Sequence, residues 1–336
     1  MRAPAAGDRP VTGPFSFHLH PAAWLAIAAV GLSYLAAVRR LARTARPGTA
    51  PTRRQWWFLA GGLLSLALAL TWPLADLAAH WSLTALLVQR LVLILAAAPL
   101  LLLAVPSAVL AAVTKPAPLD RTLEFLTRPV VAVGLFTVIA VGTLFTPVVA
   151  AQSSSGVVRG VVDAALLFGG GVLWGPVLRH IPGASRPSPV GLAAYLFVQS
   201  IVPGFPSVIY VFARHPLYPA FAHVHAALGL SPVADQQLAG VVAKVATLPV
   251  LWSVAWLALS RAARDDAQGA DTAVLTWAEV ERQLERAERR ETHPPNKRHR
   301  HRLPLPPRAD LPPMSDGPGS ASEPPGSELP GSTPGT

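Results

Sequence analysis

Residues 83–105 read LTALLVQRLVLILAAAPLLLLAV, and this stretch decides the fold class of the chain. A helix that crosses the hydrocarbon core of a bilayer needs about 20 predominantly apolar residues. The stretch reaches that length and carries a single charged residue, Arg90. It therefore predicts a transmembrane helix rather than a helix of a soluble core.

Six further apolar runs have a similar length. The seven runs cover approximately residues 21–38, 56–75, 83–105, 129–150, 157–178, 189–213 and 236–260. The composition agrees, because only 14% of the 336 residues are charged, whereas soluble domains carry about a quarter. We expect an all-α, polytopic membrane helix bundle of about seven transmembrane helices over residues 18–260, with the lipid bilayer as its main partner.

Basic residues collect in alternate connections between these runs. The basic connections hold Arg39, Arg40, Arg43, Arg46, Arg53 and Arg54, then Lys115, Arg121 and Arg128, then Arg179 and Arg186. The intervening connections hold one basic residue each or none. Short loops rich in Lys and Arg stay in the cytoplasm. We therefore expect a short extracytoplasmic N-terminus (residues 1–17) and a cytoplasmic C-terminus.

The segment 261–336 differs from the rest in composition and should form a cytoplasmic tail. Residues 276–291 predict a short polar helix, and the sequence after it is basic and rich in Pro, Gly and Ser, which predicts disorder. The basic run 297–302 is either a solvated linker or a contact with anionic lipid. The net charge of +10 is explained by membrane topology, so nucleic acid is not an expected partner.

Three charged residues interrupt the apolar runs: Arg90, Asp163 and Lys244. Each costs about 2.5–3.5 kcal/mol at a bilayer centre unless it is paired or hydrated. Each lies six to eight residues from the outer end of its run, so all three should lie about 9–12 Å below the outer surface. We expect one intramembrane polar network, which Gln89 and Gln199 could join. It is either an ion-pair clamp that fixes helix packing or a site for an ion or partner.

Histidines form a second pattern on the expected outer side. Two pairs, His18 with His20 and His223 with His225, have i,i+2 spacing. In an extended segment both imidazoles of such a pair face the same way and could share a metal, Cu(II) or Zn(II). Interfacial histidines without a ligand role are the alternative. The chain has no Cys and no phosphate loop or hydrolase motif, so we do not expect an enzyme.

Several local stretches together resemble the CtaG-type cytochrome c oxidase assembly factor family. They are residues 97–106 with Pro99, residues 171–178 with Trp174, residues 216–222 with Tyr218, and residues 230–240 with Asp235 and Gln236. Their order and spacing carry the likeness over about residues 18–260. The resemblance implies a seven-helix protein of the bacterial plasma (inner) membrane. It also implies a role in maturing a haem-copper oxidase, with oxidase subunits as partners and copper as a candidate cofactor.

The chain departs from this family pattern at its intramembrane charges. Arg90, Asp163 and Lys244 occupy positions where the family carries histidine or tryptophan, so an Arg-Asp-Lys set replaces an intramembrane histidine cluster. A guanidinium has no acceptor with which to ligate copper. Two other functions therefore stay open beside oxidase assembly: a membrane permease with a polar path through the three charges, and a structural scaffold that binds no metal.

Overall fold

The computed structural model describes residues 15, 17–43, 50–178, 181, 183–185, 187–222, 224–267 and 277–292. Most of the expected N-terminal segment 1–17 and of the tail lies outside these residues, and so does His223. In order, the helices are α1 (Pro21–Ala42), α2 (Arg53–Leu70), α3 (Leu74–His80), α4 (Leu83–Leu91), the π-helix η1 (Val92–Ala97), α5 (Ala98–Ala104), α6 (Ser107–Thr114), α7 (Ala117–Leu126), α8 (Pro129–Gly142), α9 (Thr146–Ser154), α10 (Gly156–Leu178), α11 (Pro189–Ile201), α12 (Phe205–Phe212), the 3-10 helix η2 (Pro219–Phe221), α13 (Val224–Leu228), α14 (Pro232–Ala267) and α15 (Trp277–Thr292).

The expectation of an all-α polytopic membrane bundle is confirmed. Six helical stretches in the described part of the chain are long and apolar enough to cross a membrane: Pro21–Arg40, Arg53–His80, Leu83–Ala104, Gly156–Leu178, Pro189–Phe212 and Pro232–Arg264. A seventh crossing is obtained if α7 and α8, which are bent by 80° relative to each other, count as one span. The number of crossings is therefore six or seven.

The fourth apolar run, expected to continue over 129–150, is divided into two helices. α8 ends at Gly142 and α9 begins at Thr146. Pro147 has no backbone N–H, so it cannot donate to the carbonyl of Thr143 one turn earlier. The Thr143 carbonyl accepts a hydrogen bond from Nη2 of Arg90 instead, at 2.9 Å. A proline thus ends α8 and frees a carbonyl for a side chain of α4.

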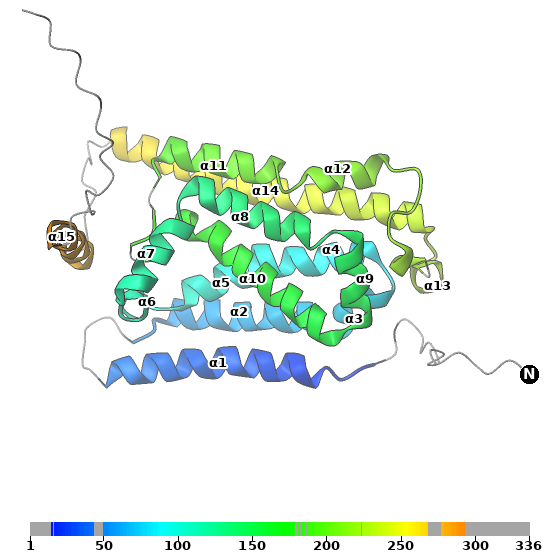
Figure 1. Cartoon of the computed structure of the whole chain (residues 1–336), viewed down its shortest axis with the longest axis horizontal. Helices are drawn as coiled ribbons and strands as arrows, with labels where there is room; N and C mark the ends of the chain where they lie inside the picture. The colour runs from blue at the N-terminus through cyan, green and yellow to red at the C-terminus, as the bar shows by residue number, and fades with distance from the viewer. Residues whose placement is uncertain are drawn as a thin grey trace, which may run out of the picture. The chain divides into compact units, whose positions relative to one another are not determined.

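The helices run back and forth, so their connections gather at two ends. Figure 1 shows the end of α1, the α6–α7 segment and the C-terminal end of α14 on the left, and α3, α9 and α13 on the right. The helix ends that border the first two basic connections, namely the end of α1, the start of α2 and the α6–α7 segment, all lie at the left end. The segment that carries His18 and His20 leads into α1 at the right end. This arrangement agrees with the charge asymmetry from which we expect an extracytoplasmic N-terminus.

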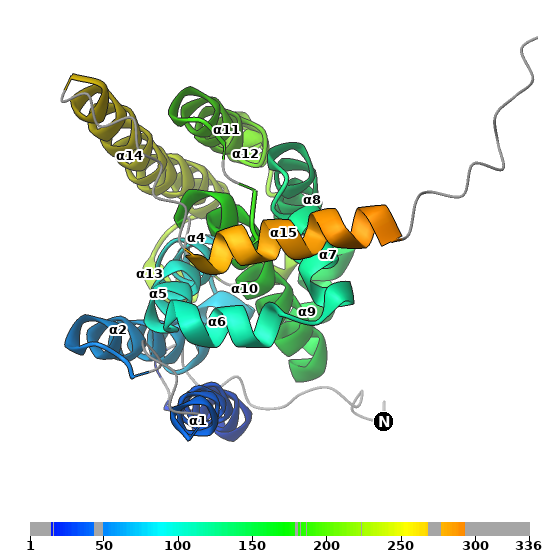
Figure 2. The ribbon, with the colours of Figure 1, turned by 90° about the vertical axis from the view of Figure 1, so that its left-hand side faces the viewer.

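α10 lies in the interior of the bundle, where it packs against α5, η1 and α8 (Figure 2). Gly170 lets α10 approach η1 and α5 closely, because a Cβ built on it would lie 2.7 Å from the Cβ of Ala98 and 3.2 Å from the Cα of Ile94. Fully buried leucines from α10 and its neighbours, such as Leu166 and Leu196, form the main hydrophobic core around this contact.

Contacts between residues divide the chain into two compact units, of which the first ends at Leu284 and the second begins at Glu285. All the helices up to α14 belong to the first unit. α15 spans Trp277–Thr292, where a short polar helix was expected over 276–291. In the second unit, Nη2 of Arg289 lies 3.3 Å from Oε2 of Glu285 at i,i+4 spacing. The expected disordered segment after this helix lies outside the described residues.

Candidate functional site: two buried pockets beside α4

Asp235 ties the start of α14 to the start of α4. Its carboxylate accepts hydrogen bonds from Oγ of Ser82 at 2.7 Å, from the backbone N–H of Leu83 at 2.7 Å and from that of Thr84 at 3.4 Å. The first backbone N–H groups of a helix have no partner within the helix, and a carboxylate there is also favoured by the helix dipole. Asp235 is only 1% exposed, so it acts as a buried cap supplied by another helix.

The neighbouring motif residues hold the segment before α14. Oε1 of Gln236 accepts a hydrogen bond from the backbone N–H of Leu217 at 2.8 Å. The hydroxyl of Tyr218 donates to the carbonyl of Leu144 at 2.6 Å and lies 2.6 Å from the hydroxyl of Tyr210. Burial raises the pKa of Tyr218, so the phenol stays neutral and keeps the proton that it donates.

Pro99 and Trp174 form a third link, between η1 and α10. The backbone N–H of Ala98 donates to the carbonyl of Leu93, five residues earlier, as in a π-helix. The next bond in that series would come from residue 99, but proline has no N–H. The carbonyl of Ile94 is therefore left for Nε1 of Trp174, which donates to it at 2.8 Å. The motif residues thus stabilise helix ends and breaks.

Arg90 is buried, with 4% of its surface exposed, and its partners lie around the break between α8 and α9. Its Nη1 donates to Oγ1 of Thr143 at 3.2 Å, and its Nη2 donates to the Thr143 carbonyl and to Oε1 of Gln152, the latter at 3.2 Å. Its Nε has no hydrogen-bond partner. All three acceptors are neutral, so the guanidinium is solvated by the protein without a contacting carboxylate.

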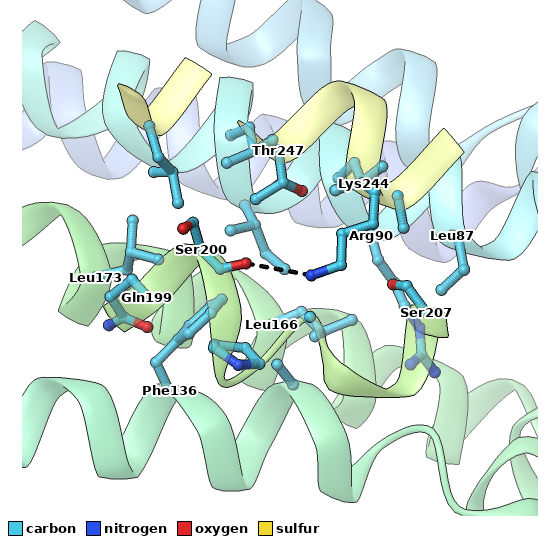
Figure 3. A pocket seen from close by; sticks show the side chains of 18 of the residues that line it. Leu87, Arg90, Phe136, Leu166, Leu173, Gln199, Ser200, Ser207, Lys244 and Thr247 are labelled. Atoms are coloured by element: carbon cyan, nitrogen blue, oxygen red, sulfur yellow. Dashed lines mark hydrogen bonds between the residues drawn. The ribbon is translucent and has the colours of Figure 1, made fainter. Parts of the chain in front are cut away.

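The pocket on this side of α4, here called the Arg90–Lys244 pocket, has a volume of about 90 Å³. Its lining combines apolar side chains with Arg90, Gln199, Ser200, Gly204, Ser207, Lys244 and Thr247. Figure 3 shows the side chain of Lys244 extending across it toward the carbonyl of Ser200, to which Nζ donates at 3.4 Å. Gly204 leaves space for this ammonium, because a Cβ there would lie 2.6 Å from Nζ.

A larger cavity lies on the other side of α4, between α1 and α10. This α1–α10 cavity has a volume of about 450 Å³, and its polar lining consists of His20, Gln89, Arg159 and Asp163. Gln89 is 2% exposed and its Nε2 has no partner. Among the described residues, none lies within ion-pair or hydrogen-bonding distance of the Asp163 carboxylate. The remaining walls are mainly apolar residues of α1, α2, α3, η1 and α10.

The expected single network is therefore divided between two pockets. Arg90, Gln199 and Lys244 line the first, and Gln89 and Asp163 line the second. No ion pair within 4.0 Å joins Arg90, Asp163 or Lys244 to one another in the described part of the chain. The reason is helix geometry: consecutive residues of an α-helix point about 100° apart, so Gln89 and Arg90 point in different directions from α4. Equal depth in the membrane did not bring the charges together.

His18 and His20 both lie next to the carboxylate of Asp76, which was not among the site residues expected from the sequence. Nδ1 of His18 lies 3.3 Å from Oδ2 of Asp76, and Nε2 of His20 lies 3.2 Å from Oδ1 of the same side chain. The sequence offered a reason to consider Asp76, because it is one of few acidic residues in 18–260 and lies next to an expected outer loop. Thr143 and Gln152, the partners of Arg90, had no comparable signal.

These histidines do not make a ready metal site. Both imidazoles of the first pair are already next to Asp76. Within the described residues no group of three or more His, Cys, Asp or Glu side chains is arranged to hold a metal ion. In the second pair His225 is exposed, whereas His223 is outside the described residues. Copper would have to bind the second ring nitrogens of these histidines, displace Asp76, or use residues outside this set.

Comparison with known proteins gives one match. The family model described as cytochrome c oxidase caa3 assembly factor (Caa3_CtaG) matches residues 32–265. The matched segment covers more than half of the chain and includes α2 to α14 almost entirely, with Asp235, Trp174 and the whole Arg90–Lys244 pocket, whereas the part of α1 that lines the α1–α10 cavity precedes it. No curated protein and no solved structure matches the chain.

Proposed function

Because the chain belongs to the cytochrome c oxidase caa3 assembly factor family, we propose that it helps to mature a haem-copper oxidase in the bacterial plasma membrane. It acts without catalysing a reaction, through contacts between its membrane helices and the subunits of the oxidase. The family match over residues 32–265 carries this proposal. The geometry supports it, since Asp235, Trp174 and Tyr218 hold helices together through hydrogen bonds.

Deletion of the gene tests this function. We expect a deletion strain to lose most of its caa3-type oxidase, measured from haem absorbance spectra of membranes and from oxygen consumption, while general solute uptake is unchanged. Complementation with the wild-type chain restores the oxidase, and the Lys115→Met variant serves as a control in a basic connection. Normal oxidase spectra in the deletion strain would refute the assembly role, and a general uptake defect would favour a permease.

A crosslinking experiment tests the proposed contact directly. The full chain, isolated from native membranes after brief crosslinking, should carry oxidase subunits in amounts well above those of other abundant membrane proteins. A matched isolation without crosslinker separates stable from transient contacts. Recovery of the chain with no oxidase subunit, from cells that assemble the oxidase, would contradict assembly by direct contact.

Copper delivery is a second candidate, supported by the side-by-side position of His18 and His20 at Asp76. Neutral imidazoles are good ligands for Cu(II). If this end of the protein takes up copper, the purified protein should bind it stoichiometrically, and combined replacement of His18, His20, His223 and His225 by alanine should abolish binding. Copper retained in full by that variant would remove these histidines as the site.

A further inference from the structure

The Arg90–Lys244 pocket contains two cations and no acid. None of the residues that line it is Asp or Glu, and neither cation has a carboxylate within 4.0 Å among the described residues. A buried charge without a partner is costly in a protein or in lipid. Asp163, the acid that was expected to compensate both, faces the α1–α10 cavity instead. The pocket lining therefore carries two positive charges and no negative one, and Asp163 attracts Arg90 only from outside the pocket, beyond contact distance.

The pocket also contains hydrogen-bond donors that the protein does not use. Nε of the buried Arg90 has no partner. Nζ of Lys244 has three N–H groups and makes one long contact of 3.4 Å with the Ser200 carbonyl. Ser207 is 6% exposed and contributes its hydroxyl to the lining. Figure 3 shows Lys244 between Ser200 and Ser207, on the polar side of the pocket.

The size and walls of the pocket favour a compact ligand. A water molecule needs about 10–15 Å³ of such volume, so the 90 Å³ of the pocket would accommodate one small ion with a few waters. The opposite wall consists of apolar side chains such as Leu166 and Leu173 together with Gln199, whose amide nitrogen already donates to Tyr195 and whose Oε1 is only an acceptor. Those side chains offer no partner to the outer oxygens of sulfate or phosphate, which would lose their hydration without compensation.

We propose that this pocket binds a compact monovalent anion, of the size of chloride, between the Lys244 ammonium and the Arg90 guanidinium. The anion accepts hydrogen bonds from Nζ of Lys244 and the hydroxyl of Ser207, and the charge of the buried Arg90 guanidinium attracts it without contact. Gly204 is a positioning residue, since any side chain there would displace the ammonium. The site does not depend on the oxidase function and would be present in a permease or a scaffold as well.

The test uses the purified full chain in detergent. Its thermal unfolding temperature is measured in sodium chloride, bromide or formate, each titrated against sodium gluconate at constant ionic strength. A ligand that binds only the folded state stabilises it in a saturable manner. We expect chloride and bromide to raise the unfolding temperature, with saturation, and gluconate to have no effect. No difference between chloride and gluconate in the wild-type protein would overturn the proposal.

Variants locate the site. Lys244→Met should abolish the chloride dependence, and Gly204→Ala should raise the chloride concentration for half-saturation at least tenfold while keeping the charge. Lys115→Met, which removes an exposed lysine at the end of α6, is the matched control and should behave as wild type. An unchanged dependence in Lys244→Met, or an equal loss in Lys115→Met, would place the anion elsewhere and refute the assignment.

A second measurement remains decisive if Lys244→Met does not fold. Chloride that exchanges with a protein site broadens the ³⁵Cl NMR line of the bulk ion. The wild-type protein should broaden this line more than an equal concentration of empty detergent micelles, and bromide should compete the excess away. Gly204→Ala should reduce the excess and Lys115→Met should not. Broadening that equals that of the micelles would refute the site.

Discussion

Replacing Asp235 with alanine removes the cap that α14 supplies to α4. The two short hydrogen bonds of the carboxylate, to Oγ of Ser82 and to the N–H of Leu83, are both 2.7 Å. A hydrogen bond to a charged group contributes about 1.5–3 kcal/mol, so their loss should destabilise the protein by about 3–6 kcal/mol. Water cannot replace the carboxylate easily, because Asp235 is 1% exposed.

The assay is unfolding of the purified protein in detergent, followed by the fluorescence of its tryptophans. Asp235→Asn keeps one acceptor oxygen and should cost about half as much as alanine. Ser231→Ala is the control, since the Ser231 hydroxyl accepts one hydrogen bond of 3.2 Å from Ala234 at the exposed start of the same helix, where a cap is worth about 1 kcal/mol. If Asp235→Ala costs no more than Ser231→Ala, the cap does not hold the two helices together.

Three further predictions concern the interior of the bundle, and each is measured by the same unfolding assay. Trp174→Phe should lower the free energy of unfolding by about 1–3 kcal/mol, because it leaves the buried carbonyl of Ile94 without a donor. Adding Pro99→Ala restores a backbone N–H beside that carbonyl and should recover part of the lost stability in a double-mutant cycle. Gly170→Ala should cost about 1–3 kcal/mol by overpacking, since a Cβ there meets another at 2.7 Å, whereas Gly171→Ala, which has open space, should be nearly neutral. Asp163→Asn should change stability by less than about 1 kcal/mol, because its carboxylate contacts no cation; a loss of several kcal/mol would show that it is paired after all.

The fold could be predicted from the sequence because length and apolarity are sufficient to identify helices that cross a bilayer. Six of the seven apolar runs correspond to such helices. The exception is the run 129–150, in which Pro147 lies one turn after Thr143 and ends the helix early. Hydropathy over a window does not detect this break, because every residue around it is apolar or small and the average barely changes.

The site was predicted only in part. Counting residues from the ends of the runs gives the depth of a side chain, and on that basis Arg90, Asp163 and Lys244 were expected together. Whether they meet also depends on the direction in which each helix presents them, and a one-residue step changes that direction by about 100°. Gln89 and Arg90 show the consequence, since they are adjacent in sequence and line different pockets. Direction depends on the packing of α4 against α3 and α14, which no local pattern encodes.

Several polar side chains in the bundle instead donate hydrogen bonds to backbone carbonyl groups at interruptions of the helices. In lipid, a backbone carbonyl that loses its helical partner must find another donor within the protein. Arg90 donates to Thr143 before Pro147, and Trp174 donates to Ile94 before Pro99. Lys244 donates to Ser200, near the end of α11, where the last carbonyls have no intrahelical partner. A cation that is held by carbonyl groups keeps its full charge, because a carbonyl dipole solvates it without neutralising it. Breaks in the helices thus explain how Arg90 can be buried and Lys244 half-buried without a contact to Asp163, and why the space between them is suited to an anion.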